Sequence, residues 1–405
     1  MIALLIEWLR MLDMHLPSAF DYYSTRAMGS CMTALVLVLA LGRPYIKFIQ
    51  TIGLAQEIRK DECVELWKLH AAKEKTPTMG GGLIIFAVVL SALFWMHLDH
   101  LYTWILVFSL ISLGLIGGYD DLLKVKYKNT SGLSGRYKLL GQLMISAGIS
   151  VVLLEGFNLK TVLKVPTIDF FLSGVQNDFG MDIVSSEGTS SLAAFSRTFF
   201  LPFFKVPWVM PVFMGSSLLL TFFYCFVITG TSNAVNLSDG LDGLAAGLLI
   251  LTALPLAVVG FLSDHIFIAE YLNLPHLHGG GEVTVFLSAL IGALIGFLWY
   301  NSFPAEIFMG DTGSLALGGI LGVCAILLRR EFFLAIAGGV FVVETLSVIL
   351  QVYSFKYRNK KRLFLCAPLH HHFEYLGWKE PKVVMRFWIC SGLFSLIALI
   401  SLKLQ

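Results

Sequence analysis

The chain has 405 residues, of which 57% are hydrophobic and only 14% are charged. Soluble domains usually contain about 25% charged residues, so the composition excludes an ordinary soluble protein and places most of the chain in a lipid bilayer. The formal net charge of +2 gives no indication of a nucleic-acid partner. The positions of the charges are more informative than their sum.

Long apolar runs separated by polar loops dominate the sequence. A membrane-spanning helix needs about 20 mainly apolar residues, and about ten runs meet this requirement. The sequence therefore predicts an all-α integral membrane protein that forms one domain over residues 1–405. The runs cover residues 24–46, 79–98, 101–119, 139–156, 209–229, 243–263, 283–299, 313–328, 332–352 and 383–403.

Two segments fall outside this pattern. Residues 1–23 begin with an apolar stretch that is too short and too interrupted to span, and that lacks a cleavage site for a signal peptide, so we expect an interfacial segment. Residues 157–208 are long and contain Gly, Ser and Pro between short alternating pieces. This pattern predicts a loop with a small hairpin.

Lys and Arg residues indicate the orientation of the chain in the membrane. They collect in the loops after the first, third and ninth predicted spans. These loops all follow odd-numbered spans and so share one side, which the positive-inside rule makes cytoplasmic. Both termini and the loop 157–208 are then expected on the exterior side.

Five polar motifs fall on the predicted cytoplasmic side, and each is rich in Asp, Asn, His or Lys. Independent loops that converge on one face are what a site assembled from several helix ends requires. The motifs are KEKTPTMGGG (73–82), YDDLLKVKYKNTSGLSGRYK (119–138), TSNAVNLSDGLDGLAAG (231–247), YNSFPAEIFMGDTGS (300–314) and LHHHFEYLGW (369–378).

Three aspartates are candidates for metal binding. Asp120 and Asp121 end the third span, and two adjacent carboxylates near lipid do not both ionise easily without a cation. The pair is a candidate Mg²⁺ ligand, a base, or both, and the alternative is a solvated helix end. Asp311 lies in a Gly-flanked turn before a span, whose N-terminal amides would suit phosphate oxygens. A few carboxylates completed by water and phosphate is the usual Mg²⁺ pattern.

The third motif places Asp239 and Asp242 three residues apart, which makes them neighbours if a helix starts there. A ligand site is one interpretation. The alternative is that Ser238 or Asp239 simply caps the sixth span. Capping does not explain Asn233 and Asn236.

The three histidines, His370, His371 and His372, raise the question of zinc. Consecutive histidines on a helix cannot all reach one tetrahedral ion, and no second cluster with zinc-ligand spacing is present in the sequence. Phosphate donors or acid–base groups fit this motif better.

Two further residue types remain open to two interpretations. Lys73 and Lys124 could hold a pyrophosphate as point charges, although positive-inside anchoring alone explains most cytoplasmic Lys and Arg, Lys138 among them. Phe308 either packs at the interface or stacks on a planar base.

Mg²⁺ carboxylates, phosphate donors and a platform that faces lipid together suggest phosphoryl transfer.

Five strings, TPTMGG, DDLLKV, TSNAVNLSDGLDGLAAG, FMGDTGS and LHHHFEYLGWKEP, together resemble the phospho-N-acetylmuramoyl-pentapeptide transferase family. The match runs from about residue 24 to the C-terminus. The resemblance implies a Mg²⁺-dependent homodimer in the bacterial inner membrane with its active site on the cytoplasmic face. The implied reaction moves phospho-MurNAc-pentapeptide from UDP-MurNAc-pentapeptide to undecaprenyl phosphate, which yields lipid I and UMP for peptidoglycan.

The resemblance also implies roles for individual residues. Asp311 corresponds to the Mg²⁺ ligand, and Asp120 and Asp121 to the acids at the lipid-phosphate side. One departure from the family is that segment 157–208 looks longer than the usual hairpin. His370 and His371 match the histidines of the family's catalytic loop, and Lys73 matches a phosphate-binding lysine. The residues that match the uridine pocket are Phe308, Asp242, Asn301, Gln351 and Lys124. Further substrate-binding candidates are Asn233, Asn236, Asp239 and His372.

Several alternatives remain at the level of sequence. Two mechanisms use the same residues. In one, the lipid phosphate attacks the sugar-bearing phosphorus directly, and in the other the reaction proceeds in two steps through an aspartyl intermediate. A relative that transfers GlcNAc-1-phosphate would share the DD and GDTGS elements, although TPTMGG and FEYLGWKEP favour the muramyl branch. A transporter would carry its acids in the middle of spans or at broken helices, whereas here we expect them in loops.

Overall fold

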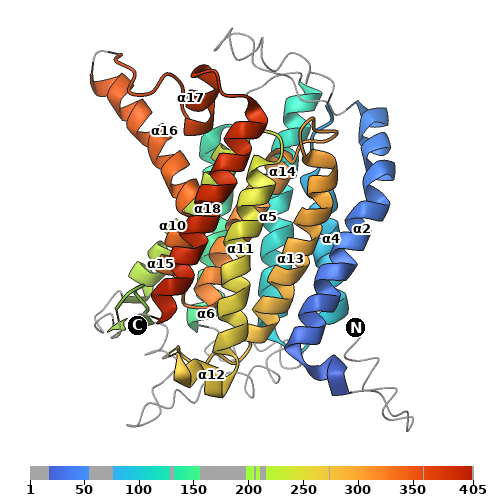
Figure 1. The fold of residues 1–405 in the computed structure, drawn as a ribbon, viewed down its shortest axis with the longest axis vertical. Coiled ribbons are helices and arrows are strands. Elements are labelled where there is room, and N and C mark those ends of the chain that lie inside the picture. Colours follow the sequence, from blue (N-terminus) through green and yellow to red (C-terminus); the bar gives the residue numbers. More distant parts are fainter. Residues whose placement is uncertain are drawn as a thin grey trace.

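The computed structural model describes residues 18–53, 76–127, 132–155, 198–204, 207–209, 216–272, 274–358 and 360–403. Over these residues the protein is a helical bundle with one two-stranded sheet (Figure 1). The long helices are α2 (Tyr23–Ile52), α5 (Leu101–Lys126), α6 (Gly135–Glu155), α10 (Ser216–Ser238), α11 (Leu244–Ser263), α13 (Gly280–Asn301), α14 (Gly310–Leu327), α16 (Gly339–Tyr357) and α18 (Glu380–Lys403). The shorter elements are η1 (Ser18–Asp21), α4 (Gly81–Trp95), α12 (Ile266–Tyr271), α15 (Glu331–Ala337), α17 (Leu369–Tyr375), β1 (Thr198–Phe199) and β2 (Trp208–Val209).

Nine of the described helices are long and apolar enough to cross a membrane. Each of them overlaps one of the predicted runs, so the all-helical fold class is confirmed. The run at 79–98 is different, because α4 has 15 residues and falls short of the roughly 17–25 that a span needs. The run at 332–352 is also divided, since the helix breaks at Gly338 into α15 and α16.

The two unusual segments are described only in part. Most of the expected interfacial segment 1–23 lies outside the described residues, which begin with η1. Of segment 157–208, the described residues contain β1, which pairs antiparallel with β2. The ring of Phe199 in β1 contacts Phe223 of α10 and Phe332 of α15 edge to face, which attaches this strand pair to the bundle.

Helix α14 is the centre of the bundle and is buried along almost its whole length. It packs closely against α5 and α10, while α13 packs against α2 and α11. The approach of α5 to α14 depends on Gly117, because a Cβ there would lie 2.1 Å from the backbone oxygen of Asp311. The end of α5 and the start of α14 therefore meet at one end of the bundle.

Helix α17 lies at the same end of the bundle, and α12 lies at the opposite end (Figure 1). Helix α16 leans away from the other helices as it approaches α17. Its outer half exposes apolar side chains such as Ile349, Val352 and Tyr353. Exposed apolar side chains on a membrane-length helix are suited to contact with lipid.

Candidate functional site

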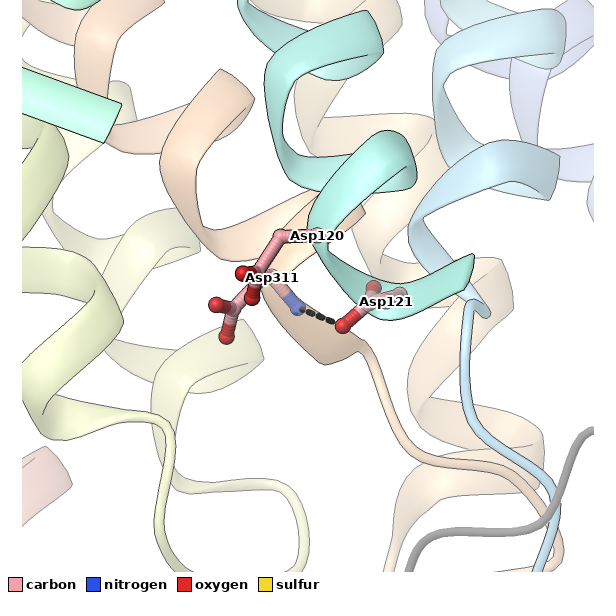
Figure 2. A group of neighbouring side chains, drawn as sticks. All are labelled: Asp120, Asp121 and Asp311. Atoms are coloured by element: carbon pink, nitrogen blue, oxygen red, sulfur yellow. Dashed lines mark hydrogen bonds between the residues drawn. The ribbon is translucent and has the colours of Figure 1, made fainter. Parts of the chain in front are cut away.

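The three aspartates predicted from separate motifs lie together. Asp120 and Asp121 belong to the last two turns of α5, and Asp311 belongs to the first turn of α14. The expectation that these acids sit in loops was therefore wrong, because both helices extend through the motifs. Ligand oxygens of the three carboxylates lie within 4.8 Å of one another (Figure 2).

Asp121 caps the N-terminus of α14. Its carboxylate accepts a hydrogen bond from the backbone N–H of Asp311 at 3.2 Å (Figure 2). It also accepts from the backbone N–H of Thr312 at 2.9 Å and from the Thr312 hydroxyl at 2.7 Å. A carboxylate at this position also complements the helix dipole. The sequence predicted that the N-terminal amides of this helix would bind phosphate oxygens. Two of these amides, those of Asp311 and Thr312, are already bonded to the Asp121 side chain.

Asp120 and Asp311 share two lysines. Lys124 Nζ lies 2.7 Å from Asp120 Oδ2 and 2.9 Å from Asp311 Oδ2. Lys138 Nζ, from α6, lies 2.8 Å and 2.6 Å from the same two oxygens. Asp120 Oδ1 also accepts a hydrogen bond of 2.5 Å from Leu133 N. Lys138 therefore has a specific partner, which the positive-inside interpretation did not predict.

The donor set of this cluster fits a hard divalent cation. Within the described part of the chain, these three aspartates are the one group of at least three His, Cys, Asp or Glu side chains close enough to hold a metal ion. Carboxylate oxygens are the ligands that Mg²⁺ prefers. Because Lys124 and Lys138 contact the same oxygens, a cation would compete with the two ammonium groups.

Two residues of the third motif border the acids. Asn236 Nδ2 donates to Asp311 Oδ1 at 2.9 Å and to Ser314 Oγ at 2.8 Å, which fixes the Asp311 side chain from α10. Burial raises the pKa of Asp239 to about 8, and the charges of Asp311 and Asp121 shift it in the same direction. Without a nearby cation Asp239 is thus mostly protonated at pH 7.

The alternative in which Ser238 or Asp239 caps the sixth span was wrong. Helix α11 begins at Leu244 with Gly243 as its N-cap residue and no capping side chain. Ser238 still belongs to α10, and its hydroxyl donates to Ala234 O at 3.0 Å. Asp239 and Asp242 therefore lie in the turn between two helices rather than on one helical face.

Asn301 and Asp242 connect this turn to the loop after α13. Asn301 Oδ1 accepts from Gly243 N at 3.1 Å, and Asn301 Nδ2 donates to Ile307 O at 2.8 Å. Asp242 Oδ2 accepts from Ala305 N at 3.0 Å. Asn301 and Asp242, which were both predicted to contact uridine, thus hold the loop that carries Phe308.

Asn233 of α10 and Gln351 of α16, two more of the predicted substrate-binding residues, also bond to neighbouring parts of the protein. Asn233 Nδ2 donates to Gln142 Oε1 at 2.9 Å, which ties α10 to α6. Gln351 Oε1 accepts from Leu363 N at 3.0 Å and from Phe364 N at 2.9 Å. Gln351 thus organises the connection between α16 and α17.

Phe308 is half-buried, and its backbone pairs with the first motif. Phe308 N donates to Pro77 O at 2.9 Å, and Gly80 N donates to Phe308 O at 2.8 Å. The side chain is not among those packed against the hydrophobic core. Lys73, from the same first motif, lies outside the described residues.

The three histidines of α17 have three different environments. His370 is buried against Glu344 of α16, His371 Nδ1 lies 2.8 Å from Glu374 Oε2, and His372 Nδ1 accepts from Leu365 N at 3.2 Å. No described histidine belongs to a group with metal-ligand geometry.

Sequence reasoning missed Glu344, Glu374 and the local role of Lys138. Glu344 had a usable signal, since it is an acid inside the apolar run 332–352, and an ionisable residue within a span is by default functional. Glu374 and Lys138 had no such signal, because acids and bases are common in polar loops.

Known proteins resemble the chain over its full length. Residues 103–329 match the family model described as Glycosyl transferase family 4. The chain is 50% identical over 412 residues to a phospho-N-acetylmuramoyl-pentapeptide-transferase of Protochlamydia amoebophila, which covers 100% of both proteins. Proteins of the same name from Methylacidiphilum infernorum and Thermodesulfovibrio yellowstonii are 44% and 42% identical, each over 96% of both proteins. The chain therefore belongs to the phospho-N-acetylmuramoyl-pentapeptide-transferase family.

Proposed function

We propose that the protein transfers phospho-MurNAc-pentapeptide from UDP-MurNAc-pentapeptide to undecaprenyl phosphate, with lipid I and UMP as products. The extent of identity to relatives named for this activity supports the assignment. The cluster of three aspartates and two lysines also supports this reaction. Phosphoryl transfer depends mainly on positioning the substrates and neutralising their charge, and such a cluster can do both.

Mg²⁺ is the proposed cofactor, and Asp311 is its proposed protein ligand. Asp121 is less suited to this role, because three hydrogen bonds from α14 already occupy its oxygens. When bound, Mg²⁺ would supply positive charge to the phosphate oxygens of the substrates. Lys124 and Lys138 would then be free to contact the same phosphates.

The proposed step is a direct displacement. An oxygen of undecaprenyl phosphate attacks the sugar-bearing phosphorus, the bond from that phosphorus to the bridging oxygen breaks, and UMP leaves with the bonding electrons. Asp120 orients the lipid phosphate and accepts its remaining proton, since its carboxylate is not engaged in capping a helix. Lys124 and Lys138 neutralise the charge on the transferred group.

A direct step is distinguished from the aspartyl route by leaving out the acceptor. With UDP-MurNAc-pentapeptide alone, a two-step enzyme releases one equivalent of UMP per active site, because the aspartyl intermediate forms without lipid. The direct mechanism releases no UMP until undecaprenyl phosphate is added. A rapid-quench measurement with radiolabelled uridine separates these outcomes.

The nucleotide is proposed to bind beside the acids, at the loop that Asn301 and Asp242 hold in place. Phe308 is the proposed stacking partner of uracil, and its exclusion from the packed core supports this role over simple packing. The further residues proposed to border the bound nucleotide are Asn233, Asn236, Asp239, Gln351 and His372. Those proposed to face the phosphates are His370, His371 and Lys73.

We further propose that the protein is a homodimer in the bacterial inner membrane with this site on the cytoplasmic face. The clustering of Lys and Arg in three loops supports the orientation, and the resemblance to the family supports the dimer. Native mass spectrometry of the purified protein in detergent would test the dimer, which predicts twice the chain mass.

The activity itself is tested with purified protein, UDP-MurNAc-pentapeptide and undecaprenyl phosphate, scored for UMP release. We expect turnover with this donor and no turnover with UDP-GlcNAc in its place. The Asp311→Asn variant, which keeps the shape of the side chain but removes its charge, serves as the inactive control. Equal turnover with UDP-GlcNAc would assign the protein to the GlcNAc-1-phosphate branch instead.

A further inference from the structure

Glu344 is a buried acid in α16 that none of the proposed steps uses. Its side chain is 0% exposed, and that of its partner His370 is 1% exposed. The Glu344 carboxylate accepts the backbone N–H of His370 at 3.1 Å, and its second oxygen lies 3.2 Å from His370 Nδ1. Because a carboxylate only accepts hydrogen bonds, this contact requires a proton on Nδ1.

The opposite ring nitrogen of His370 is buried and has no hydrogen-bond partner among the residues that the structure describes. This nitrogen, Nε2, lies against the turn between α10 and α11. A Cβ on Gly240 would lie only 2.3 Å from it, so a larger residue at position 240 would require the His370 ring to move. The same turn carries Asp239 and Asp242. A buried nitrogen without such a partner needs an explanation, and its place beside this turn makes a contact with substrate the explanation to test.

His371 and His372 are held differently. His371 pairs with Glu374 of its own helix, three residues later, and His372 accepts from the backbone of Leu365. The carboxylate partner of His370 comes from another element, α16. A carboxylate that bonds one ring nitrogen fixes which tautomer is present and where the other nitrogen points.

From this geometry we propose that Glu344 is a positioning residue for His370. It keeps the proton on Nδ1 and directs Nε2 at a phosphate oxygen of the UDP-linked substrate, beside the turn of residues 239–242. A protonated ring would donate to that oxygen through Nε2, since both nitrogens of the charged ring are donors. This inference rests on the proposed function and adds a residue to it.

The first test compares Glu344→Gln with Ser347→Ala. Glutamine keeps the size of the side chain but presents an NH₂ group to one of the two N–H donors of His370. Ser347 lies on the same helix, is equally buried, and donates only to the backbone oxygen of Glu344, so its variant is the matched control. We expect Glu344→Gln to lower kcat/KM for UDP-MurNAc-pentapeptide about 10- to 100-fold, the usual effect of losing such a partner. The KM for undecaprenyl phosphate and the turnover of Ser347→Ala should stay near wild-type values.

The decisive test is a double-mutant cycle with His370→Asn. If Glu344 acts through His370, Glu344→Gln causes no further loss when His370 is already replaced. Losses that multiply in the double variant would overturn the proposal. Glu344→Asp, which keeps the charge on a shorter side chain, should recover part of the activity, and equal activity of the Asp and Gln variants would also contradict it.

The outcomes separate this inference from the proposed function. If the wild-type protein releases no UMP from UDP-MurNAc-pentapeptide and undecaprenyl phosphate, the function fails and Glu344 is not at issue. If the wild type is active and Asp311→Asn is inactive, but the cycle is multiplicative, only the role of Glu344 fails. A melting temperature for every variant shows whether a loss reflects unfolding instead, and in that case Glu344→Asp carries the test.

Discussion

Asp120 and Asp121 are neighbours in sequence but have different surroundings. Successive residues of an α-helix point about 100° apart, so one carboxylate faces α14 and the other faces the two lysines. Asp121 accepts three hydrogen bonds from Asp311 and Thr312 and lies 3.7 Å from Lys124 Nζ. Asp120 lies closer to the lysines, at 2.7 Å from Lys124 Nζ and 2.8 Å from Lys138 Nζ. Asp121 holds the start of α14 in place, and we propose that Asp120 takes part in the chemistry.

This difference predicts different phenotypes for the two Asn variants. Both should lose at least tenfold in turnover, which corresponds to about 1.4 kcal/mol of activation free energy. Asp121→Asn should also lower the free energy of unfolding by about 0.5–2 kcal/mol, the range for a lost helix cap. UMP release and thermal unfolding in detergent measure the two effects. A stability of Asp121→Asn equal to that of the wild type would remove the capping role from Asp121.

Phe308 offers a second test at the same scale. If it stacks on uracil, Phe308→Ala should weaken binding of the UDP-linked substrate by roughly 1–3 kcal/mol, as for other base–aromatic contacts. The apparent affinity for undecaprenyl phosphate and the melting temperature should not change. A similar loss for both substrates, together with a lower melting temperature, would instead show that the ring only packs.

The candidate site residues could be predicted from sequence where they lay in a distinctive motif. The contacts that these residues make between motifs could not be predicted. The aspartates and histidines were all found as candidates, because acids and imidazoles beside spans are conspicuous. The capping by Asp121 was not predictable, since it depends on how α5 crosses α14. The bonds that hold Glu344 to His370 likewise join residues 26 positions apart.

At the scale of elements, the crossing of α5 and α14 decides where the acids meet. Gly117 and Gly118 are adjacent on α5, but only the first faces the partner backbone. A Cβ on Gly117 would lie 2.1 Å from Asp311 O, whereas one on Gly118 would lie 3.6 Å from the Thr312 hydroxyl oxygen, an ordinary contact. The two positions therefore form a matched pair for mutagenesis.

We expect Gly117→Ala to separate the two helices and displace Asp311. Overpacking of this kind usually costs about 1–3 kcal/mol of stability, and the distorted acid cluster should reduce turnover more than tenfold. Gly118→Ala should leave both quantities close to wild type. Melting temperature and UMP release of the two variants provide the comparison, and equal behaviour of both would contradict this account of the crossing.

Most helices could be predicted from apolar runs alone, because the bilayer requires a continuous length of apolar side chains. The exceptions have physical reasons. Helix α4 is short because the chain before Gly81 pairs with the backbone of Phe308 instead of continuing the helix. The break at Gly338 lies inside an apolar run, where hydropathy gives no sign of a change in direction.

At the scale of the whole molecule, cation binding should stabilise the fold. A ligand at 100 times its Kd adds about 2.7 kcal/mol to the free energy of unfolding, so saturating Mg²⁺ should raise the melting temperature. Asp311→Asn should abolish this increase, because it removes a shared carboxylate charge. KCl at matched ionic strength is the control. An equal increase with KCl, or in the variant, would contradict a specific site.

The orientation of the bundle gives a further prediction. Lys361 lies in the exposed connection between α16 and α17, and Glu270 is exposed on α12 at the other end of the molecule. After the native cysteines are replaced, Glu270→Cys should react with a membrane-impermeant maleimide on intact cells, whereas Lys361→Cys should react only after permeabilisation. The reverse pattern would invert the topology and move the acids to the exterior.

The two lysines shared by Asp120 and Asp311 have a consequence for the sign of the site. Three ionised carboxylates and two ammonium groups give the cluster a formal charge of −1, which repels phosphates. Addition of one divalent ion reverses this to +1. A cluster with this positive charge would attract the two anionic substrates, whose mutual repulsion the reaction must overcome. We therefore propose that metal binding reverses the sign of the charge that the site presents to a phosphate.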